Sequence, residues 1–380
     1  MKLLKKFVKF CLAKVFSFLP QKYILFESAP DYSDNTWAVY DYIVKNRLAK
    51  NYKLIWVAAD CKNVNKSIKT VVNDSKIINV IKYKYYIYRS KMLVFCNRVI
   101  PKLSNKQISL YLTHGSVAKN VVGKCTMPAD LDYCLYQSEM LKQPMNEAFL
   151  LTDHTKMINL GYPRNDDLLL ENNIDIKSLF DTEFEKIIVW YPTFRQHKNG
   201  ERDVSSTTIP IIEDENAAKQ VNDFAKEHKV IIVLKPHFAQ DTSYIKDSKL
   251  SNIVIVNDDF LRENNIRSYQ FVGLCDALLT DYSSIYYDYL LTDKPIGLTW
   301  DDYDEYAQRE GFAVNMESLF AGGEKIYNVE DFCKFIKNVA TGNDTLKLER
   351  KRVRDLTNKY QDANSSKRVA EFVINLVEKD

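Results

Sequence analysis

Several signatures of common enzyme classes are missing from this sequence. The seven cysteines are scattered and no two form a Cys-x-x-Cys pair, so the sequence predicts neither a zinc knuckle nor a dithiol redox centre. The chain has no Gly-x-x-x-x-Gly-Lys-Ser/Thr loop, which argues against P-loop phosphoryl transfer. It also has no Gly-x-Ser-x-Gly elbow, which argues against an α/β-hydrolase. No group of His, Asp and Glu shows obvious metal-ligand spacing, so we predict no metal site and no certain cofactor, and leave dependence on a divalent cation open.

An excess of one charge is missing as well. The 380 residues hold 53 lysines and arginines against 50 aspartates and glutamates, so the whole-protein charge gives no argument for a nucleic-acid partner. The apolar fraction of 46% is enough for a sizeable core, and the length predicts two domains. An odd number of cysteines without a secretory signal favours reduced thiols in the cytoplasm.

The longest apolar stretch near the start is interrupted by lysine. The first 20 residues, MKLLKKFVKFCLAKVFSFLP, hold five lysines and no acidic residue. They are too short, and too often charged, to cross a hydrocarbon core of about 30 Å, and the lysines also argue against a signal peptide. Most of the apolar residues share one helical face and four lysines share the other. We therefore predict a basic amphipathic helix over residues 1–20 that lies on an anionic membrane surface; the alternative is a helix packed on the protein's own body.

Short apolar runs alternate with helical patterns, which predicts parallel sheets covered by helices. In the first half we predict strands at residues 22–27, 53–59, 77–80, 92–96, 108–113 and 133–137, and helices at 37–49, 85–90 and 139–149. In the second half we predict strands at 186–190, 230–234, 252–256 and 277–279, and helices at 213–228, 266–275, 331–340 and 346–378, with a further helix opening at residue 285.

A polar, Asn-rich stretch at residues 171–175 divides these two halves. We accordingly predict an N-terminal Rossmann-like domain at 21–175 and a C-terminal one at 176–345. Residues 346–380 are expected to form a C-terminal helix that packs over the domains.

The stretch Thr280-Asp281-Tyr282-Ser283-Ser284 links the strand at 277–279 to the next helix. Both serines are good N-cap residues, because a hydroxyl can accept a hydrogen bond from a free N–H of the first helical turn. A helix start also carries partial positive charge, which makes it a natural seat for phosphate. The alternative is an ordinary capped helix without a ligand.

Two histidines follow predicted strands. His114-Gly115 ends the strand at 108–113, and Lys235-Pro236-His237 follows the strand at 230–234. Open α/β sheets place their chemistry at the carboxyl ends of strands, and Gly115 allows a sharp turn and a close ligand approach. Lys235 and His237 could reach a shared anion. Alternatively, both histidines are inert loop residues and Lys235 is a solvated strand end.

Further cationic residues accompany two turns. Gly161-Tyr162-Pro163-Arg164-Asn165-Asp166 is a rigid turn that positions Arg164 and Asp166, unless it merely closes a domain with a surface ion pair. Arg195 follows the strand at 186–190, and Arg309 follows an acidic, aromatic turn.

Two α/β halves whose strand-end residues converge on one central cleft describe a two-domain transferase of the GT-B kind. The predicted substrate is an anionic, nucleotide-linked donor. Ser283 and Ser284 would form its anion seat, Lys235, Arg195 and Arg309 would supply positive charge, and His114 could deprotonate an acceptor.

In order along the chain, these motifs resemble the CDP-glycerol glycerophosphotransferases of teichoic acid and capsule synthesis, over roughly residues 22–320. The motifs that carry the resemblance are His114-Gly115, Gly161 to Asp166, Pro192-Thr193-Phe194-Arg195, Leu234-Lys235-Pro236-His237, Thr280 to Ser284 with Asp288, Lys294 and Pro295, and the turn with Asp302, Tyr306, Arg309 and Gly311.

The resemblance implies that an acceptor hydroxyl attacks the β-phosphorus of CDP-glycerol and that CMP leaves. His114 would be the general base, and His237 would stabilise charge on the donor phosphates. Ser283, Ser284, Thr280 and Asp281 would hold the pyrophosphate. Gly115, Arg164 and Asp166 would serve the structure or the acceptor side. The acceptor domain would be the first and the CDP-donor domain the second.

The resemblance also implies a polyprenyl-diphosphate-linked acceptor and a peripheral position at the cytoplasmic face of the membrane. Three alternatives stay open. The donor could be CDP-ribitol or another CDP-alditol, the reaction could be glycosyl transfer from a nucleotide sugar, or the chain could be a membrane-bound scaffold without activity. Neither primer versus polymerase activity nor the oligomeric state follows from the sequence.

Overall fold

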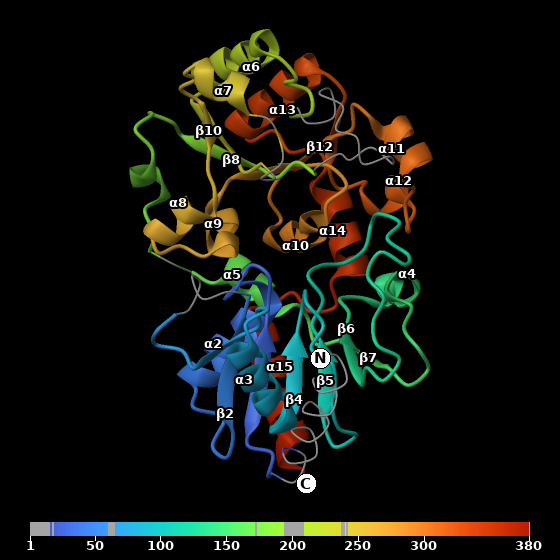
Figure 1. The fold of residues 1–380 in the computed structure, drawn as a ribbon. Coiled ribbons are helices and arrows are strands. Elements are labelled where there is room, and N and C mark those ends of the chain that lie inside the picture. Colours follow the sequence, from blue (N-terminus) through green and yellow to red (C-terminus); the bar gives the residue numbers. More distant parts are fainter. Residues whose placement is uncertain are drawn as a thin grey trace. The chain divides into compact units, whose positions relative to one another are not determined.

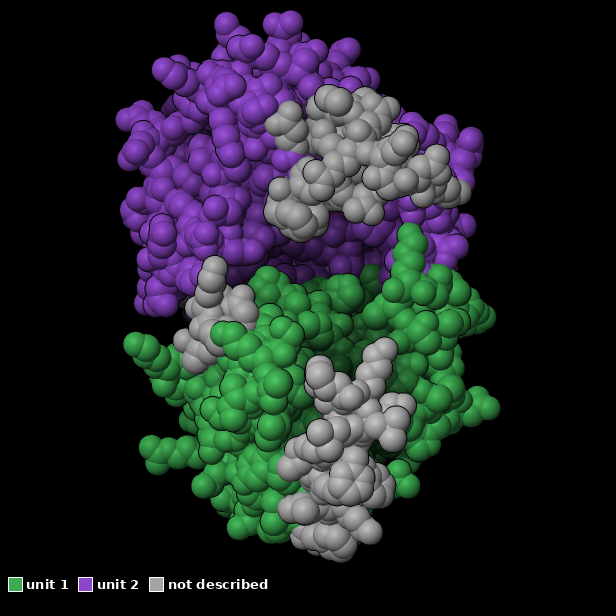
Figure 2. Space-filling model, in the orientation of Figure 1, with its two compact units in different colours: residues 1–116, 122–166, 362–380 green, residues 117–121, 167–361 purple. Residues whose placement is uncertain are grey.

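The computed structural model describes residues 16, 19–59, 65–171, 173–193, 209–236, 240 and 242–379. The chain forms two compact units, which are coloured separately in Figure 2. Unit 1 comprises residues 1–116, 122–166 and 362–380, and unit 2 comprises residues 117–121 and 167–361. These bounds differ from the domain limits expected from the sequence, because segment 117–121 joins unit 2 and the chain end joins unit 1. Our assignment of an acceptor and a donor domain stays a proposal.

Unit 1 contains a seven-stranded sheet in the order β3-β2-β1-β4-β5-β6-β7. Every neighbouring pair is parallel. The strands are β1 (Tyr23–Glu27), β2 (Lys53–Ala58), β3 (Thr70–Val72), β4 (Ser90–Phe95), β5 (Ile108–Tyr111), β6 (Tyr133–Leu135) and β7 (Lys156–Ile158). The helices are α2 (Asp34–Lys45), α3 (Ile77–Tyr88), α4 (Glu139–Phe149), η1 (Pro163–Asn165) and α15 (Ser365–Glu378), and α5 (Asp166–Leu169) continues into unit 2.

Unit 2 contains a six-stranded parallel sheet in the order β10-β9-β8-β11-β12-β13. Its strands are β8 (Lys186–Trp190), β9 (Val230–Leu234), β10 (Ile253–Ile255), β11 (Ala277–Thr280), β12 (Ile296–Thr299) and β13 (Glu324–Ile326). Its helices are η2 (Ile176–Leu179), α6 (Glu215–Glu227), α7 (Ser243–Asp247), α8 (Asp258–Glu263), α9 (Ser268–Leu274), α10 (Ile285–Tyr289), η4 (Leu290–Thr292), α11 (Tyr303–Arg309), α12 (Met316–Leu319), α13 (Val329–Thr341) and α14 (Lys347–Thr357).

The two sheets confirm the predicted α/β class with two parallel-strand sheets. In unit 2 the strands β9 and β11 are buried along their whole length, as their continuous apolar runs predict for a sheet covered on both faces. Helices α6 and α13 pack together over one face of this sheet (Figure 1), and their apolar residues join those of the strands in one core. Each of these helices begins at a side-chain cap, Asp214 for α6 and Asn328 for α13.

The end of the chain corrects the prediction of one helix over residues 346–378. The structure has two helices, α14 in unit 2 and α15 in unit 1, separated by residues 358–364. Helix α15 does not wrap over the domains as predicted. It packs against α2 (Figure 1), and Val369, Val373 and Val377 enter the core of unit 1. The spacing of these valines at four residues gives α15 the apolar stripe that such a position needs.

The strand predicted at residues 77–80 is wrong, because these residues form the first turn of α3. Ile77, Ile78 and Val80 favour a strand by propensity, but the pattern continues at helical length to Tyr88. The acidic turn near Asp302 is also helical, since α11 begins at Tyr303.

The amphipathic helix predicted for residues 1–20 lies almost entirely outside the described residues. Within the part of the chain that the structure describes, no helix has the length and hydrophobicity needed to cross a membrane.

Candidate functional site

The strand order of unit 2 reverses between β8 and β11. From β8 the chain builds β9 and β10 on one side, and then returns to add β11, β12 and β13 on the other side. At such a reversal the loops after neighbouring strands separate and leave a crevice at the carboxyl edge of the sheet, where α/β proteins bind ligands.

An open pocket of about 410 Å³ lies at this edge, within the range of about 300–1,000 Å³ typical of ligand sites. The loops after β8, β9 and β11 line it together with one residue of segment 117–121. The described lining residues are Tyr191, Pro192, Thr193, Lys235, Pro236, Ser283 and Lys119. Two are lysines and none is acidic, so this lining favours an anion.

Lys235 lies where the sequence placed it, directly after β9. Its side chain is 20% exposed, and its Nζ lies 2.9 Å from Asp258 Oδ1. The ammonium also lies 5.4 Å from the centre of the Tyr191 ring. Burial alone would lower the pKa of Lys235, but Tyr191 and Asp258 outweigh that effect and raise the pKa above its ordinary value. Lys235 is therefore charged at neutral pH.

Thr280 and Asp281, which the resemblance implied as pyrophosphate contacts, both bond to the backbone of neighbouring loops. Both are fully buried. The Asp281 carboxylate accepts hydrogen bonds of 2.6 Å from the backbone N–H groups of Thr193 and Tyr282. The Thr280 hydroxyl donates to the carbonyl of Tyr191 at 2.9 Å. These hydrogen bonds hold the loop after β8 against the turn after β11, and the role of Thr280 and Asp281 in holding the pyrophosphate stays a prediction.

The two serines of this turn also differ from each other. Ser283 lines the pocket, whereas Ser284 does not. Ser284 is the N-cap residue of α10, but its side chain makes no capping hydrogen bond, which corrects the predicted cap. Helix α10 has only five residues before the 3₁₀ turn η4, so its dipole is small. An anion seat here would depend on Ser283 and the lysines more than on the helix.

Arg309, at the end of α11, does not line this pocket. Its Nη1 lies 3.3 Å from Glu305 Oε1, and its guanidinium lies 5.7 Å from the centre of the Tyr306 ring. Its Nε and Nη2 atoms are buried and have no hydrogen-bond partner among the described residues. The structure thus places Arg309 beside an aromatic cluster around Tyr282. Its role as a contact to the donor stays a prediction.

His114 belongs to unit 1 and follows β5. Its side chain is exposed. The residues beside it have unusual backbone angles: φ is 54° at Thr113 and 140° at Gly115. A positive φ is rare for a β-branched residue such as threonine, so the surrounding structure must hold this turn in place.

Two polar side chains bond to the turn that carries His114, and one of them is in turn held by Asp34. Arg164 Nη1 donates to the carbonyl of His114 at 2.8 Å and to Asp34 Oδ1 at 2.9 Å. Asn35 Nδ2 donates to the carbonyl of Thr113 at 2.9 Å, and Asn35 Oδ1 accepts from the backbone N–H of Arg164 at 3.1 Å. Arg164 is 8% exposed, so it positions His114 from inside unit 1.

Asp166, at the end of the same motif, fixes α15. Its carboxylate accepts the backbone N–H groups of Ser365 at 2.9 Å and Ser366 at 2.7 Å, which are unpaired donors at the start of that helix. Gly161 packs closely against the Ser365 side chain of the same helix start. Its φ is +78°, and a Cβ there would lie 2.3 Å from Ser365 Oγ.

His237 and Arg195 lie outside the described residues. Each follows a pocket-lining loop in sequence, Arg195 after Thr193 and His237 after Pro236.

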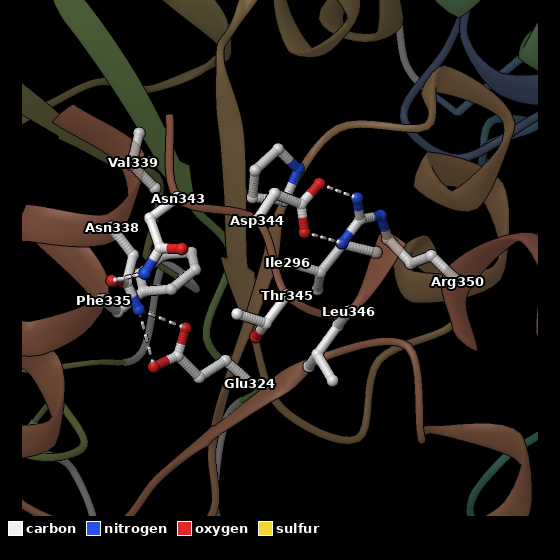
Figure 3. Close-up of a pocket in the computed structure, with 11 residues that line it drawn as sticks. Ile296, Glu324, Phe335, Asn338, Val339, Asn343, Asp344, Thr345, Leu346 and Arg350 are labelled. Atoms are coloured by element: carbon white, nitrogen blue, oxygen red, sulfur yellow. Dashed lines mark hydrogen bonds and ion pairs between the residues drawn. The ribbon is translucent and has the colours of Figure 1, made fainter. Parts of the chain in front are cut away.

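A second cavity in unit 2 is too small for a nucleotide donor, at about 10 Å³ (Figure 3). Several of its polar side chains bond to one another. Arg350, which is 1% exposed, donates to Asp344 Oδ1 at 2.9 Å, and Asn338 Nδ2 donates to both carboxylate oxygens of Glu324 at 3.1 Å. Figure 3 marks both pairs with dashed lines. Among the described residues no group of three or more His, Cys, Asp or Glu is placed to hold a metal ion.

Sequence reasoning missed two residues of these sites. Lys119 lines the pocket in unit 2, but no strand precedes it and its charge alone gave no signal. Asn35, in the first turn of α2, supports His114, but it belongs to a polar stretch of the sequence that carried no motif.

The family model described as CDP-glycerol:poly(glycerophosphate) glycerophosphotransferase matches residues 9–375. This chain belongs to that family. It is 24% identical over 328 residues to the teichoic acid glycerol-phosphate primase of Bacillus subtilis (strain 168), covering 81% of this chain and 79% of the primase. It is 21% identical over 257 residues to the teichoic acid ribitol-phosphate primase of Bacillus spizizenii (strain ATCC 23059 / NRRL B-14472 / W23), covering 64% of this chain and 59% of that primase.

The fold is also similar to a solved structure of the wall teichoic acid polymerase TagF, a histidine variant soaked with CDPG. The TM-score is 0.73 with 18% identity, over 97% of this chain and 93% of TagF. At this identity the likeness shows the fold, which is that of TagF. Membership of the glycerophosphotransferase family makes the protein a transferase.

Proposed function

We propose that this member of the glycerophosphotransferase family transfers glycerol phosphate from CDP-glycerol to a hydroxyl group of a lipid-linked teichoic acid or capsule acceptor, and that it releases CMP. The observation that carries the proposal is the pocket at the switch point of unit 2, where Lys119, Lys235 and Ser283 face an open volume of nucleotide size. The family match supports the choice of CDP-glycerol.

In the proposed reaction an acceptor oxygen forms a bond to the β-phosphorus of the donor. The bond between that phosphorus and the oxygen of CMP breaks, and CMP leaves with the electron pair. We assign His114 as the general base that takes the acceptor proton. Its exposed side chain on a clamped turn suits this role, because a base must be both accessible and held in one orientation.

The chain's contribution to phosphoryl transfer is chiefly positioning and neutralisation of charge. Lys235 is charged at neutral pH and lines the pocket, so it is suited to the donor diphosphate. We assign the same role to Ser283. Arg195 and His237 follow the pocket loops in sequence and stay predicted contributors, as does Arg309, whereas Ser284 does not line the pocket and is not assigned a contact to the donor.

The acceptor and the location are proposed on the relatives and on the first 20 residues. The relatives named for teichoic acid synthesis support a teichoic acid acceptor, and we propose that this acceptor is linked to a polyprenyl diphosphate at the cytoplasmic face of the membrane. The one-sided lysines of residues 1–20 favour attachment to anionic lipid. Deletion of residues 2–19 should abolish co-flotation with anionic vesicles and leave neutral-vesicle controls unchanged. Undiminished flotation of the shortened chain would remove this segment as the anchor.

Transfer of ribitol phosphate is the second candidate, because a ribitol-phosphate primase is among the relatives. The two donors share the cytidine diphosphate group and differ only in the polyol.

The released nucleotide separates the candidates. The purified full chain is incubated with CDP-glycerol, CDP-ribitol or a panel of nucleotide sugars, each with a lipid-linked acceptor extract. We expect CMP from CDP-glycerol. CMP from CDP-ribitol alone would keep the mechanism and change the donor. A nucleoside diphosphate from a nucleotide sugar would replace phosphotransfer with glycosyl transfer. If no donor is consumed, calorimetry on the same donors tells an enzyme without its acceptor from a scaffold that binds none of them.

A further inference from the structure

Segment 117–121 belongs to unit 2, although the residues on both sides of it belong to unit 1. The segment is held by the backbone of residues 311–313. Lys119 and Phe312 form an antiparallel bridge. On either side of it, Asn120 N–H donates to Gly311 O at 3.0 Å and Ala313 N–H donates to Ala118 O at 2.9 Å. The position of Lys119 is therefore fixed by backbone contacts that do not depend on its own side chain.

The partner strand is fixed in turn by aromatic packing. The Phe312 ring lies 5.3 Å from the Tyr282 ring and 5.7 Å from the Tyr306 ring, measured between ring centres. Tyr282 directly precedes Ser283, which lines the pocket. The same cluster thus places Lys119 and Ser283 on the wall of one pocket.

The Lys119 side chain points to the loop after β8. Its Nζ lies 3.5 Å from Thr193 Oγ1, at the outer limit of a hydrogen bond. Thr193 itself is anchored through its N–H to the buried Asp281 carboxylate. The Thr193 hydroxyl that Lys119 meets also donates to Asp281, so Lys119 lies near this buried carboxylate, while no acidic residue is among the described residues that line the pocket itself.

We propose that Lys119 is a donor-binding residue, which contacts the diphosphate of the CDP-linked donor together with Lys235 and Ser283. The inference rests on the proposed function. The two lysines reach the pocket from different elements, Lys235 from the loop after β9 and Lys119 from the bridge with residues 311–313. A diphosphate carries charge on two phosphoryl groups, so two cations that arrive from separate loops can neutralise both.

Lys119 also follows His114 by five residues in the sequence. A donor held by Lys119 would restrain the segment that continues from the turn carrying the base. Lys119 would then affect turnover as well as affinity.

The test is calorimetric titration of the full-length protein with CDP-glycerol at low ionic strength. We compare wild type with Lys119→Met, Lys119→Arg and the control Lys229→Met. Lys229 lies in unit 2, is 66% exposed and pairs with Glu185. Loss of one charge-assisted contact predicts about 10- to 100-fold weaker binding for Lys119→Met. Lys119→Arg should recover most of the affinity, and Lys229→Met should bind like wild type.

Two further measurements separate charge from structure. The thermal unfolding midpoint of Lys119→Met should equal that of wild type, because the backbone bridge remains. The difference in affinity between wild type and Lys119→Met should shrink at about 1 M salt, where charges are screened over about 3 Å.

Equal affinity of wild type and Lys119→Met for CDP-glycerol would overturn the inference and leave the proposed function intact. The same holds if affinity falls only in proportion to a lowered unfolding midpoint. If wild type itself binds no CDP-glycerol and no CDP-ribitol, the proposed donor is wrong and the assignment of Lys119 falls with it.

Discussion

Single residues in the unit 2 pocket fall into those that face the open volume and those that support it. Lys119, Lys235 and Ser283 face it. Thr280 and Asp281 are buried and hold the loops by hydrogen bonds of 2.6–2.9 Å. This division could not be obtained from the sequence, because Thr280 to Ser284 are adjacent and all polar. Only the turn geometry decides which side chain faces the pocket.

The adjacent serines provide a matched pair of variants. Ser283→Ala should weaken CDP-glycerol binding by roughly 5- to 15-fold, because a net hydrogen bond is worth about 1–1.5 kcal/mol. Ser284→Ala should bind within about twofold of wild type, since its side chain makes no capping bond and does not line the pocket. Calorimetry with CDP-glycerol measures both. A stronger effect at Ser284 than at Ser283 would contradict the assignment.

His114 and Arg164 are predicted to act as a unit. His114→Ala should lower kcat at least about 100-fold with donor affinity largely kept, because a placed base contributes about 10²–10⁴-fold. Arg164→Lys cannot reproduce the two contacts that Nη1 makes to His114 O and Asp34. We expect it to lower kcat about tenfold without changing the donor KM.

The double variant tests whether Arg164 acts through His114. If it does, His114→Ala with Arg164→Lys should be no slower than His114→Ala alone, because the two losses are not additive. Full additivity of the two effects would show that Arg164 acts on its own. A His114→Ala enzyme within threefold of wild-type kcat would remove the histidine as the base.

At the scale of elements, the buried central strands were the most predictable part of the fold. β8 and β9 occupy the residues expected, because uninterrupted runs such as Val230 to Leu234 suit only a strand covered on both faces. Edge strands such as β3, β7 and β13 were missed, since each has only three residues and shows no clear alternation of apolar and polar residues. A strand was wrongly predicted at residues 77–80 because β-branched residues begin α3, whose buried residue lies in its last turn.

The candidate site was predicted in the same uneven way. Lys235 could be placed because it directly follows a strong strand signal, and the carboxyl ends of parallel strands share one edge. The place of Lys119 could not be predicted, because it depends on a bridge to Phe312, which lies 193 residues further along the chain. The residues next to Lys119 in the sequence do not indicate a contact so far along the chain.

The contact between Gly161 and the start of α15 gives a prediction at this scale. Gly161→Ala adds a Cβ 2.3 Å from Ser365 Oγ at a φ of +78°. Gly123, also in unit 1, has a φ of +76° but nothing within 4 Å of its added Cβ. Gly123→Ala should cost about 1 kcal/mol of unfolding free energy for the backbone angle, and Gly161→Ala about 1–3 kcal/mol more for overpacking. Urea unfolding measures both, and equal losses would show that the Ser365 side chain or α15 moves aside without cost.

At the scale of the whole molecule, the chain passes between its units more often than the sequence suggests. Residues 117–121 leave unit 1 to complete the pocket of unit 2, and residues 362–380 return to complete the core of unit 1. A single domain boundary at the Asn-rich stretch of residues 171–175 therefore cannot describe how the chain is divided between the two units. Fragments cut at residue 175 would therefore lack α15 in the first part and Lys119 in the second, so experiments on either unit require the full chain.

The central claim is that the carboxyl edge of β8, β9 and β11 binds the donor diphosphate. The most direct measurement is a crystal structure of the full chain soaked with CDP-glycerol. We predict that the phosphate oxygens lie within hydrogen-bond distance of Lys235 Nζ, Lys119 Nζ and Ser283 Oγ, with Asp281 still bound to the Thr193 loop. Donor density at another place, with these three side chains free of phosphate, would contradict the account.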